Sequence, residues 1–321
     1  HVASTGGLWE SELAAQGIQH HKILDIDSKN PVTVLKLLFS IHQIIKQKGI
    51  TIVHTHHRMA AFYIRLLKFV YPKLTHVYTA HNVFKDKLPL YRFALKNAKS
   101  VAVGEAVNNN LKEDVGITDS KVIYNGVILK ETDNQVDDIV GYDGTKLGCI
   151  ARLSEQKGLT YLIEAMSLLT IKNIRLFIVG DGELRNELEN KVEELHLQDS
   201  VTFLGYRKDI VECINSFDFL VSSSLFEGLA LNVIETFMNG KTMVATDIPG
   251  INEIVNNENG ILVPAQNPGA LASAIDKLAT DVPLRNRLAF HAKKTYEERF
   301  SYSMFLENYR ALYREIQGEP K

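Results

Sequence analysis

The residues best suited to chemistry lie where a short apolar run ends in small hydroxyl residues and a helical pattern follows. Residues 222–237 read Ser-Ser-Ser-Leu-Phe-Glu-Gly-Leu-Ala-Leu-Asn-Val-Ile-Glu-Thr-Phe, which predicts a loop carrying Glu227 and a helix opened by Gly228. Backbone N–H groups at a helix start bind phosphate, and a nearby carboxylate accepts hydrogen bonds from polyol hydroxyls. Glu235 follows eight positions after Glu227, about 12 Å along a continuous helix. The carboxylates suit the two ends of a nucleotide-sugar, although a solvated helix face with an N-terminal charge explains them equally well.

Two cations lie in the predicted loop after the first strand of the second half of the chain, residues 147–151. Arg152 and Lys157 occupy this loop, where doubly wound folds bind phosphates. Two cations can neutralise a diphosphate leaving group, and each charge-assisted hydrogen bond contributes about 1.5–3 kcal/mol. The loop lacks the Walker pattern. A pair of ordinary surface cations is the alternative interpretation.

Two glycine turns give weaker signals. Residues 179–183 carry only two glycines of a three-glycine nucleotide fingerprint, so ordinary tight-turn chemistry explains them as well. Gly205 and Tyr206, followed by Arg207, come after another predicted strand and suit contact with a base.

Histidines end two predicted strands of the first half, at residues 54–57 and 79–82. Clustered imidazoles can bind metal, transfer protons or hydrogen-bond sugar hydroxyls. No nearby carboxylate or cysteine completes a set of metal ligands, so we predict no metal site. We expect a structural role for His54 and a ligand-facing role for His81.

The elements that must position these residues are short Val- and Ile-rich runs alternating with helix-length amphipathic segments. This alternation predicts parallel sheets of βαβ units. The polar, acidic segment 130–143 predicts a linker. We therefore expect an α/β protein of two doubly wound, Rossmann-like domains, residues 1–129 and 144–300, with ligands at the carboxyl strand ends facing a cleft. The predicted strands are residues 50–54, 76–80, 100–103, 122–124, 147–151, 174–179, 201–204, 217–222, 242–246 and 261–263.

Composition narrows the class of protein. The chain has 321 residues, 45% of them hydrophobic, with a net charge of −2, which fits a globular two-domain protein and does not favour nucleic acid as a partner. Two cysteines make no disulfide framework, and no apolar run approaches the roughly 20 residues of a spanning helix. The chain opens on His-Val-Ala-Ser without a signal-peptide pattern. We expect a cytoplasmic protein with a trimmed N-terminus.

Charge is unevenly distributed. Between Lys29 and Gly104 there are thirteen lysines and arginines but one acidic residue, Asp86, while the remainder has 23 basic and 37 acidic residues. The basic stretch contains the amphipathic segment 61–71. An anionic membrane surface or anionic substrate is one interpretation, and an ordinary core helix with solvated lysines is the other.

Taken together, these features resemble the retaining nucleotide-sugar glycosyltransferases of the GT-B fold, family four. The resemblance covers nearly the whole chain. Its most specific pieces are residues 226–228 with Glu235, spaced as the Glu-x7-Glu motif of the family, and Arg152 with residues 157–158. Supporting pieces are residues 124–127, 179–182, 203–205 and 260–264.

The resemblance implies roles for individual residues. Arg152 and Lys157 would hold the donor diphosphate, Glu227 the sugar and Glu235 the ribose, while His81 matches the histidine beside the reacting sugar. The family is metal-independent, uses no resident cofactor, and retains configuration by front-face attack in which the departing phosphate oxygen takes the acceptor proton. The residues expected to bind the nucleotide-sugar are Arg152, Lys157, Gly205, Tyr206, Glu227, Gly228, Leu229, Ala230, Leu231 and Glu235; those expected in catalysis are His81, Glu227, Arg152 and Lys157.

The start of the chain departs from the family pattern. The family opens with a strand, a glycine-rich loop and a helix, whereas residues 5–7 resemble the turn after the second strand. We therefore expect about 30–40 residues to be missing, with the loss of an inner strand from the first sheet. We expect residues 301–321 to form a helix that crosses back to the first domain.

The leading hypothesis is a glycosyltransferase that moves a sugar from a nucleotide-sugar to a glycan or lipid-linked acceptor. The resemblance implies UDP as the nucleotide. We expect the enzyme to act in cell-surface polysaccharide or glycoconjugate synthesis, at the inner face of the membrane. The first alternative is a non-catalytic nucleotide-sugar binding protein. The second is a GT-B sugar-nucleotide epimerase, whose different arrangement of carboxylates and histidine we do not find.

Overall fold

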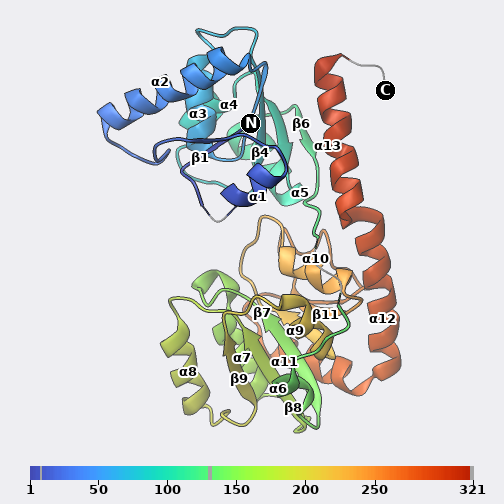
Figure 1. Cartoon of the computed structure of the whole chain (residues 1–321). Coiled ribbons are helices and arrows are strands. Elements are labelled where there is room, and N and C mark those ends of the chain that lie inside the picture. The colour runs from blue at the N-terminus through green and yellow to red at the C-terminus, as the bar shows by residue number, and fades with distance from the viewer. Residues whose placement is uncertain (8, 129–131, 319–321) are drawn as a thin grey trace. The chain divides into compact units, whose positions relative to one another are not determined.

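The computed structural model describes residues 1–7, 9–128 and 132–318, and the chain divides into two compact units (Figure 1). Unit 1 comprises His1–Val103 and Val107–Val122, and unit 2 comprises Gly104–Ala106 and Ile123–Lys321. The predicted start of the linker at residue 130 lies outside the described residues. Each unit is α/β with parallel strands, as the alternating pattern predicts.

Unit 1 contains two separate parallel sheets. Its elements are β1 (Val2–Ser4), α1 (Glu10–Ala15), β2 (His20–Lys22), α2 (Pro31–Lys48), β3 (Ile52–Thr55), α3 (Arg58–Leu67), β4 (Thr75–Ala80), α4 (Leu88–Leu95), β5 (Lys99–Ala102), α5 (Glu105–Asn109, shared with unit 2), η1 (Asn110–Val115) and β6 (Ser120–Val122). One sheet pairs β1 with β2, and the other has the order β3-β4-β5-β6. Packing of Ile45 on α2 against Ile64 and Leu67 on α3 and Leu74 supports the second sheet.

Three strands of unit 1 differ from the list of predicted strands. Neither β1 nor β2 is in that list, since each has only three residues and the sequence of β2, His-His-Lys, contains no apolar run. The strand β6 ends at Val122, two residues before the predicted end, and buried Ile123 follows it. Burial of that side chain therefore continues beyond the hydrogen-bonded ladder, which is why the apolar pattern misplaced the strand.

Unit 2 is built on one six-stranded parallel sheet with the order β12-β11-β10-β7-β8-β9. Its strands are β7 (Thr145–Ile150), β8 (Ile174–Val179), β9 (Val201–Gly205), β10 (Phe219–Ser222), β11 (Met243–Thr246) and β12 (Ile261–Val263). Its helices are α6 (Asp137–Val140), η2 (Glu155–Lys157), α7 (Leu159–Ser167), α8 (Arg185–Glu194), α9 (Ile210–Ser216), α10 (Leu231–Met238), α11 (Pro268–Thr280), α12 (Val282–Thr295), η3 (Tyr296–Phe300) and α13 (Tyr302–Gln317). Buried side chains of the strands and of α7 and α11 form one core. All six strands correspond to predicted ones.

The ends of unit 2 refine two predictions. The short helix α6 lies within the segment predicted as a linker, where Ile139 is fully buried. The helix α13 ends at Gln317, and the last predicted residues, 319–321, lie outside the described part. Its return to the first domain stays a prediction. In the described parts of the chain, no helix combines the length and the apolar character needed to cross a membrane.

Candidate functional site

Two loops of unit 2 that are distant in the sequence lie against one another. One follows β7 and the other follows β10, and these strands are neighbours in the sheet. The Ser223 hydroxyl donates to the Lys157 carbonyl at 2.8 Å, and the Leu225 N–H donates to the Gln156 carbonyl at 2.8 Å. The sheet order therefore joins the two loops that the sequence analysis selected separately.

Gly158 permits this close approach. Its φ of +59° lies in the left-handed region, and a Cβ on it would lie 2.3 Å from the Ser223 carbonyl oxygen. Only glycine meets both conditions without displacing the other loop. The Lys-Gly pair thus combines a cation with the residue that lets the cation reach its partner.

Lys157 and Glu227 form a direct ion pair between the two loops. Lys157 Nζ lies 2.6 Å from Glu227 Oε1, and the side chains are 19% and 8% exposed. Gln156 Nε2 donates to the other carboxylate oxygen at 3.3 Å. Because a charge this buried is costly without a partner, each ion holds the other at the end of β7 and β10.

The helix α10 begins later than predicted. It starts at Leu231, not at Gly228, because Ala230 has extended backbone angles and donates its N–H to the Gly250 carbonyl at 3.1 Å. Among the described residues, no acceptor is found for the N–H groups of Gly228, Leu229 and Leu231. These amides remain suited to an anion, whereas the amide of Ala230 is engaged.

Glu235 lies on the second turn of α10 as a half-buried carboxyl group. No hydrogen bond or ion pair of its side chain is found within the described chain. Burial raises its pKa to about 7, since the ionised form is poorly solvated there. A ligand that supplies hydroxyl donors would favour the ionised form.

Arg152 has a different partner from Lys157. Its guanidinium lies 3.1 Å from Glu183 Oε2, and the two side chains are 72% and 54% exposed. Glu183 follows β8, which neighbours β7 on the side away from β10. The two predicted diphosphate cations are therefore divided between two carboxylates. Sequence reasoning assigned no role to Glu183, although an acidic residue after the neighbouring strand was a usable signal.

The turns after β8 and β9 also meet. The Gly180 N–H donates to the Gly205 carbonyl at 2.8 Å. Tyr206 is 75% exposed, so its ring is accessible to a planar ligand. Arg207 forms a hydrogen-bonded ion pair with Asp209. The helix α8 begins at Arg185, directly after the turn formed by residues 183–184.

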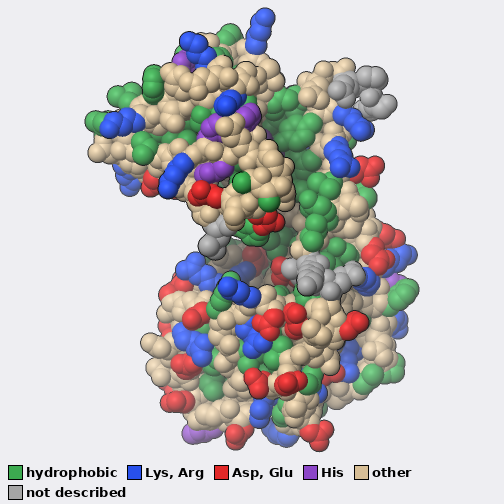
Figure 2. Space-filling view, in the orientation of Figure 1, with side chains coloured by type: hydrophobic (Ala, Val, Ile, Leu, Met, Phe, Trp, Pro, Cys, Tyr) green, Lys and Arg blue, Asp and Glu red, His purple; other side chains and the backbone are tan. Residues whose placement is uncertain are grey.

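In unit 1 the histidines after β3 and β4 form a compact group, and Figure 2 shows purple histidine side chains gathered on this unit. His56 Nδ1 lies 3.0 Å from His81 Nε2, and the rings of His54 and His56 stack at 4.3 Å. His54 Nε2 lies 2.7 Å from the Thr79 hydroxyl. Burial lowers the pKa of His54 to about 3 and that of His81 below its usual value. A neutral imidazole ring can both donate a hydrogen bond to a hydroxyl group and accept one from it.

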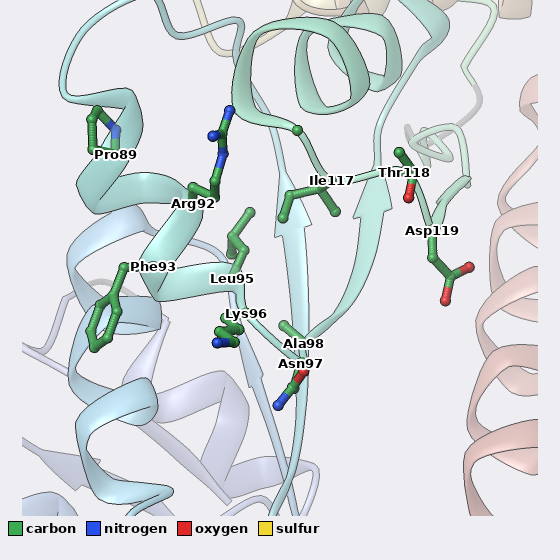
Figure 3. Close-up of a pocket in the computed structure, with 11 residues that line it drawn as sticks. Pro89, Arg92, Phe93, Leu95, Lys96, Asn97, Ala98, Ile117, Thr118 and Asp119 are labelled. Carbon is green, nitrogen blue, oxygen red and sulfur yellow. The ribbon is translucent and has the colours of Figure 1, made fainter.

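Figure 3 shows a hollow of about 680 Å³ in unit 1. It is lined by residues such as Arg92 on α4, Ala98 before β5 and Asp119 before β6. It thus lies at the amino ends of the strands, whereas His81 follows the carboxyl end of β4. Ligands of doubly wound sheets bind at the carboxyl ends, so we do not assign this hollow to the site. Within the described residues, no group of three or more histidine, cysteine, aspartate or glutamate side chains could hold a metal ion.

Two family profiles match the chain. The profile described as glycosyl transferases group 1 matches residues 140–295, and that described as glycosyltransferase family 4 matches residues 1–131. An uncharacterized glycosyltransferase of Methanocaldococcus jannaschii is 31% identical over 216 residues, covering 61% of this chain and 55% of that protein. The chain thus spans about half the length of this relative.

Solved structures resemble this chain over both units. A glycosyltransferase from Rickettsia africae superposes with a TM-score of 0.83 at 26% identity, covering 98% of this chain and 89% of that one. The Anabaena protein HepE, in complex with UDP-glucose, superposes with a TM-score of 0.82 at 22% identity, covering 97% and 90%.

Proposed function

The chain belongs to the group 1 glycosyltransferases and has their GT-B fold, and on that premise we propose that it moves a sugar from UDP-sugar to a glycan or lipid-linked acceptor with retention of configuration. The observation that carries the proposal is the Lys157–Glu227 pair beside the amides of Gly228, Leu229 and Leu231, which have no acceptor among the described residues. This arrangement offers a cation and N–H donors to phosphate next to a carboxylate for sugar hydroxyls. The UDP-glucose bound by HepE supports the choice of nucleotide.

Each residue then has a definite task. Lys157 and the loop amides bind the diphosphate, with Arg152 released from Glu183 as the second cation. Glu227 accepts hydrogen bonds from the donor sugar, and Glu235 accepts them from the ribose. The remaining assignments are Gly205 and Tyr206 to the base and His81 to the reacting sugar.

The proposed transfer balances without a resident metal or cofactor. The bond between the anomeric carbon and the diphosphate oxygen breaks, and a bond to the acceptor oxygen forms on the same face of the sugar. The departing phosphate oxygen takes the proton of the acceptor hydroxyl. The cations and N–H donors stabilise the charge that develops on the leaving diphosphate, so no enzymic nucleophile takes part.

Calorimetric titration with UDP, GDP and their sugars, without added metal, tests the donor site. We expect one nucleotide to bind, and Lys157→Ala to weaken it at least about tenfold, because charge-assisted hydrogen bonds contribute about 1.5–3 kcal/mol. Lys172→Ala is the matched control, since this exposed lysine precedes the amino end of β8, whereas Lys157 follows the carboxyl end of β7. Equal affinity in both variants would contradict the assignment of Lys157.

A second titration separates loss of nucleotide binding from loss of folding. Lys157→Ala leaves buried Glu227 without its cation, so a loss of folding would also abolish binding. Arg152→Ala removes an exposed cation at little cost to stability and should still weaken nucleotide binding. Nucleotide binding without transfer to any glycan or lipid-linked acceptor would favour the non-catalytic alternative.

An exposed apolar surface favours a membrane-bound acceptor. Val32, Leu35 and Phe39 lie on one face of α2 and are 59%, 66% and 63% exposed. Phe69 and Val70, just after α3, are 69% and 63% exposed. We name these five side chains the α2–α3 patch. A helix that presents apolar side chains in this way can lie in a membrane interface.

The positive charge around the α2–α3 patch favours a membrane with anionic lipids. Between Asp27 and Asp86 the chain contains nine lysines and arginines and no acidic residue. Each such cation contributes about 1 kcal/mol near an anionic bilayer. We therefore propose that unit 1 associates peripherally with an anionic membrane surface, at the cytoplasmic face where lipid-linked acceptors would be reached.

A further inference from the structure

Gln156 connects the two loops of the unit 2 site at three points. It lies in η2, directly before Lys157. Its main-chain carbonyl accepts a hydrogen bond from the Leu225 N–H at 2.8 Å. Its side-chain Nε2 donates to the Phe226 carbonyl at 2.9 Å and to Glu227 Oε2 at 3.3 Å. One residue of the first loop therefore contacts three consecutive residues of the second.

The chemistry of the partners fixes the orientation of the Gln156 amide. A carbonyl oxygen and an ionised carboxylate accept hydrogen bonds and do not donate them. The amide must therefore turn its nitrogen, and not its oxygen, toward both Phe226 and Glu227. Both hydrogens of Nε2 are then used. A side chain held at both of its N–H groups also restrains the two groups that accept from it.

The carboxylate of Glu227 has a different partner at each oxygen. Oε1 lies 2.6 Å from Lys157 Nζ, and Oε2 accepts from Gln156. An ammonium group is a compact point charge, and the last torsion of a glutamate side chain has broad preferences. The lysine alone therefore fixes one oxygen and leaves the plane of the carboxylate free to rotate. The amide at the second oxygen fixes that plane.

The plane of the carboxylate determines which acceptor directions remain for a ligand. An ionised carboxylate offers about four lone-pair sites, and the side chains of Lys157 and Gln156 occupy only two of them. Hydrogen bonds weaken steeply away from linear geometry. A fixed plane at Glu227 therefore favours hydroxyl groups at particular positions on a sugar ring.

Apolar packing contributes little to this part of the second loop. The Phe226 side chain is 62% exposed, and the regular hydrogen bonds of α10 begin only at Leu231. The hydrogen bond from Gln156 to the Phe226 carbonyl therefore restrains the main chain directly before Glu227. Gln156 thus acts on both the backbone and the carboxylate of the residue that we assign to the sugar.

We propose that Gln156 is a positioning residue for Glu227 and determines how much the donor sugar, apart from the nucleotide, contributes to binding. The inference rests on the proposed function, because it takes Glu227 as the acceptor for sugar hydroxyls. Gln156 is uncharged, so it orients the carboxylate without neutralising it. Lys157 keeps the separate task of binding phosphate.

Calorimetric titration with UDP and with UDP-glucose tests the inference. Gln156→Met keeps a side chain of similar length and removes both N–H donors. We expect it to raise the ratio of the Kd for UDP-glucose to the Kd for UDP by about tenfold, as the loss of a hydrogen bond to a charged group predicts. A role limited to joining the loops would raise both constants alike and leave the ratio unchanged.

Asn232→Leu is the matched control. The Asn232 side-chain amide also joins two distant segments, because its Nδ2 donates to the Ile150 carbonyl at 3.1 Å. Its oxygen accepts from the Val233 N–H at 3.0 Å, so its hydrogen bonds do not include Glu227. This variant should keep the Kd ratio of the unaltered chain. A rise equal to that of Gln156→Met would indicate a general loosening of the loops and would overturn the inference.

A measurement on the unaltered chain covers the case in which a variant fails to fold. We expect the side-chain N–H resonances of Gln156 to differ between the UDP complex and the UDP-glucose complex, because the sugar hydroxyls bind the same carboxylate. Identical resonances in the two complexes, or an unchanged Kd ratio in Gln156→Met, would overturn the inference and leave the nucleotide site intact. No binding of UDP by the unaltered chain would instead overturn the proposed function, and this inference with it.

Discussion

At the scale of single residues, the two loop cations of unit 2 are held differently. Lys157 is in a largely buried pair with Glu227, while Arg152 is in an exposed pair with Glu183. Exposed pairs contribute about 0–1 kcal/mol, so Arg152 can change partner at little cost. Lys157, by contrast, is held in position before the ligand binds, by the carboxylate of Glu227 that we assign to the sugar.

Glu235 carries a prediction about pH. Its pKa is raised in the folded chain to about 7 from 4.5. The folded state therefore binds more protons than the unfolded state between these values, and stability falls as pH rises through that window. We expect Glu235→Gln to raise the free energy of unfolding by about 1–2 kcal/mol at pH 8 and to leave it unchanged at pH 4. Denaturant unfolding at both pH values measures the difference.

The same variant should lose nucleotide affinity, since an amide oxygen is a weaker acceptor for ribose hydroxyls than a carboxylate. The exposed Glu194→Gln on α8 is the control, because it removes the same charge without the burial. Nucleotide affinity equal to that of the unaltered chain would contradict the ribose assignment. A gain in stability over the unaltered chain that is as large at pH 4 as at pH 8 would contradict the raised pKa of Glu235.

At the scale of elements, the site depends on how strands are ordered and on where helices begin. The loop after β7 touches the loop after β10 because these strands are neighbours, although β8 and β9 come between them in the chain. The late start of α10 at Leu231 leaves the Gly228 and Leu229 amides in an open turn. The N–H groups suited to an anion therefore belong partly to this turn and partly to the first residue of α10.

Gly158 provides the test at this scale. We expect Gly158→Ala to destabilise unit 2 by about 1–2 kcal/mol from its left-handed backbone alone, and by more because its Cβ would meet the Ser223 carbonyl. Nucleotide binding should weaken as Lys157 moves with the loop. Thermal unfolding and calorimetric titration measure the two effects.

Gly240→Ala is a matched control. Gly240 also has a left-handed φ, +64°, but no atom lies within 4 Å of the position of a Cβ. It should share the backbone cost and leave nucleotide affinity unchanged. Equal affinity in the two variants would show that the close approach of the loops has no part in binding.

At the scale of the whole molecule, charged side chains and exposed apolar side chains are distributed differently over the two units. Acidic side chains are visible mainly on unit 2 (Figure 2), while the basic stretch and the α2–α3 patch belong to unit 1. Opposite charge on the two units would let unit 1 meet an anionic surface while unit 2 is repelled from it.

Vesicle sedimentation tests this division. We expect vesicles with phosphatidylglycerol to carry down the chain and neutral phosphatidylcholine vesicles to leave it in solution. The double variant Leu35→Ser/Phe39→Ser should bind about tenfold more weakly or worse, since burying one large apolar side chain contributes about 1.5–3 kcal/mol. Phe290→Ser on α12, where the ring is 69% exposed, is the control. Unchanged binding of the double variant would leave only a non-specific charge effect and contradict docking by the patch.

The amino-acid sequence alone determined the class of the fold and the positions of most strands. Apolar runs and turn residues are local signals, so all six strands of unit 2 could be predicted from them. The motif around Glu227 and the loop around Lys157 were also readable, because each is a short pattern of residue types. The three-residue β2, without an apolar run, gave no such signal.

Only the tertiary structure decided which of these residues meet. The contact of Lys157 with Glu227, the pairing of Arg152 with Glu183 and the burial that raises the pKa of Glu235 all follow from strand order and packing. Such contacts join segments far apart in the chain. Their formation depends on which strands lie side by side, and no local run of residue types specifies that.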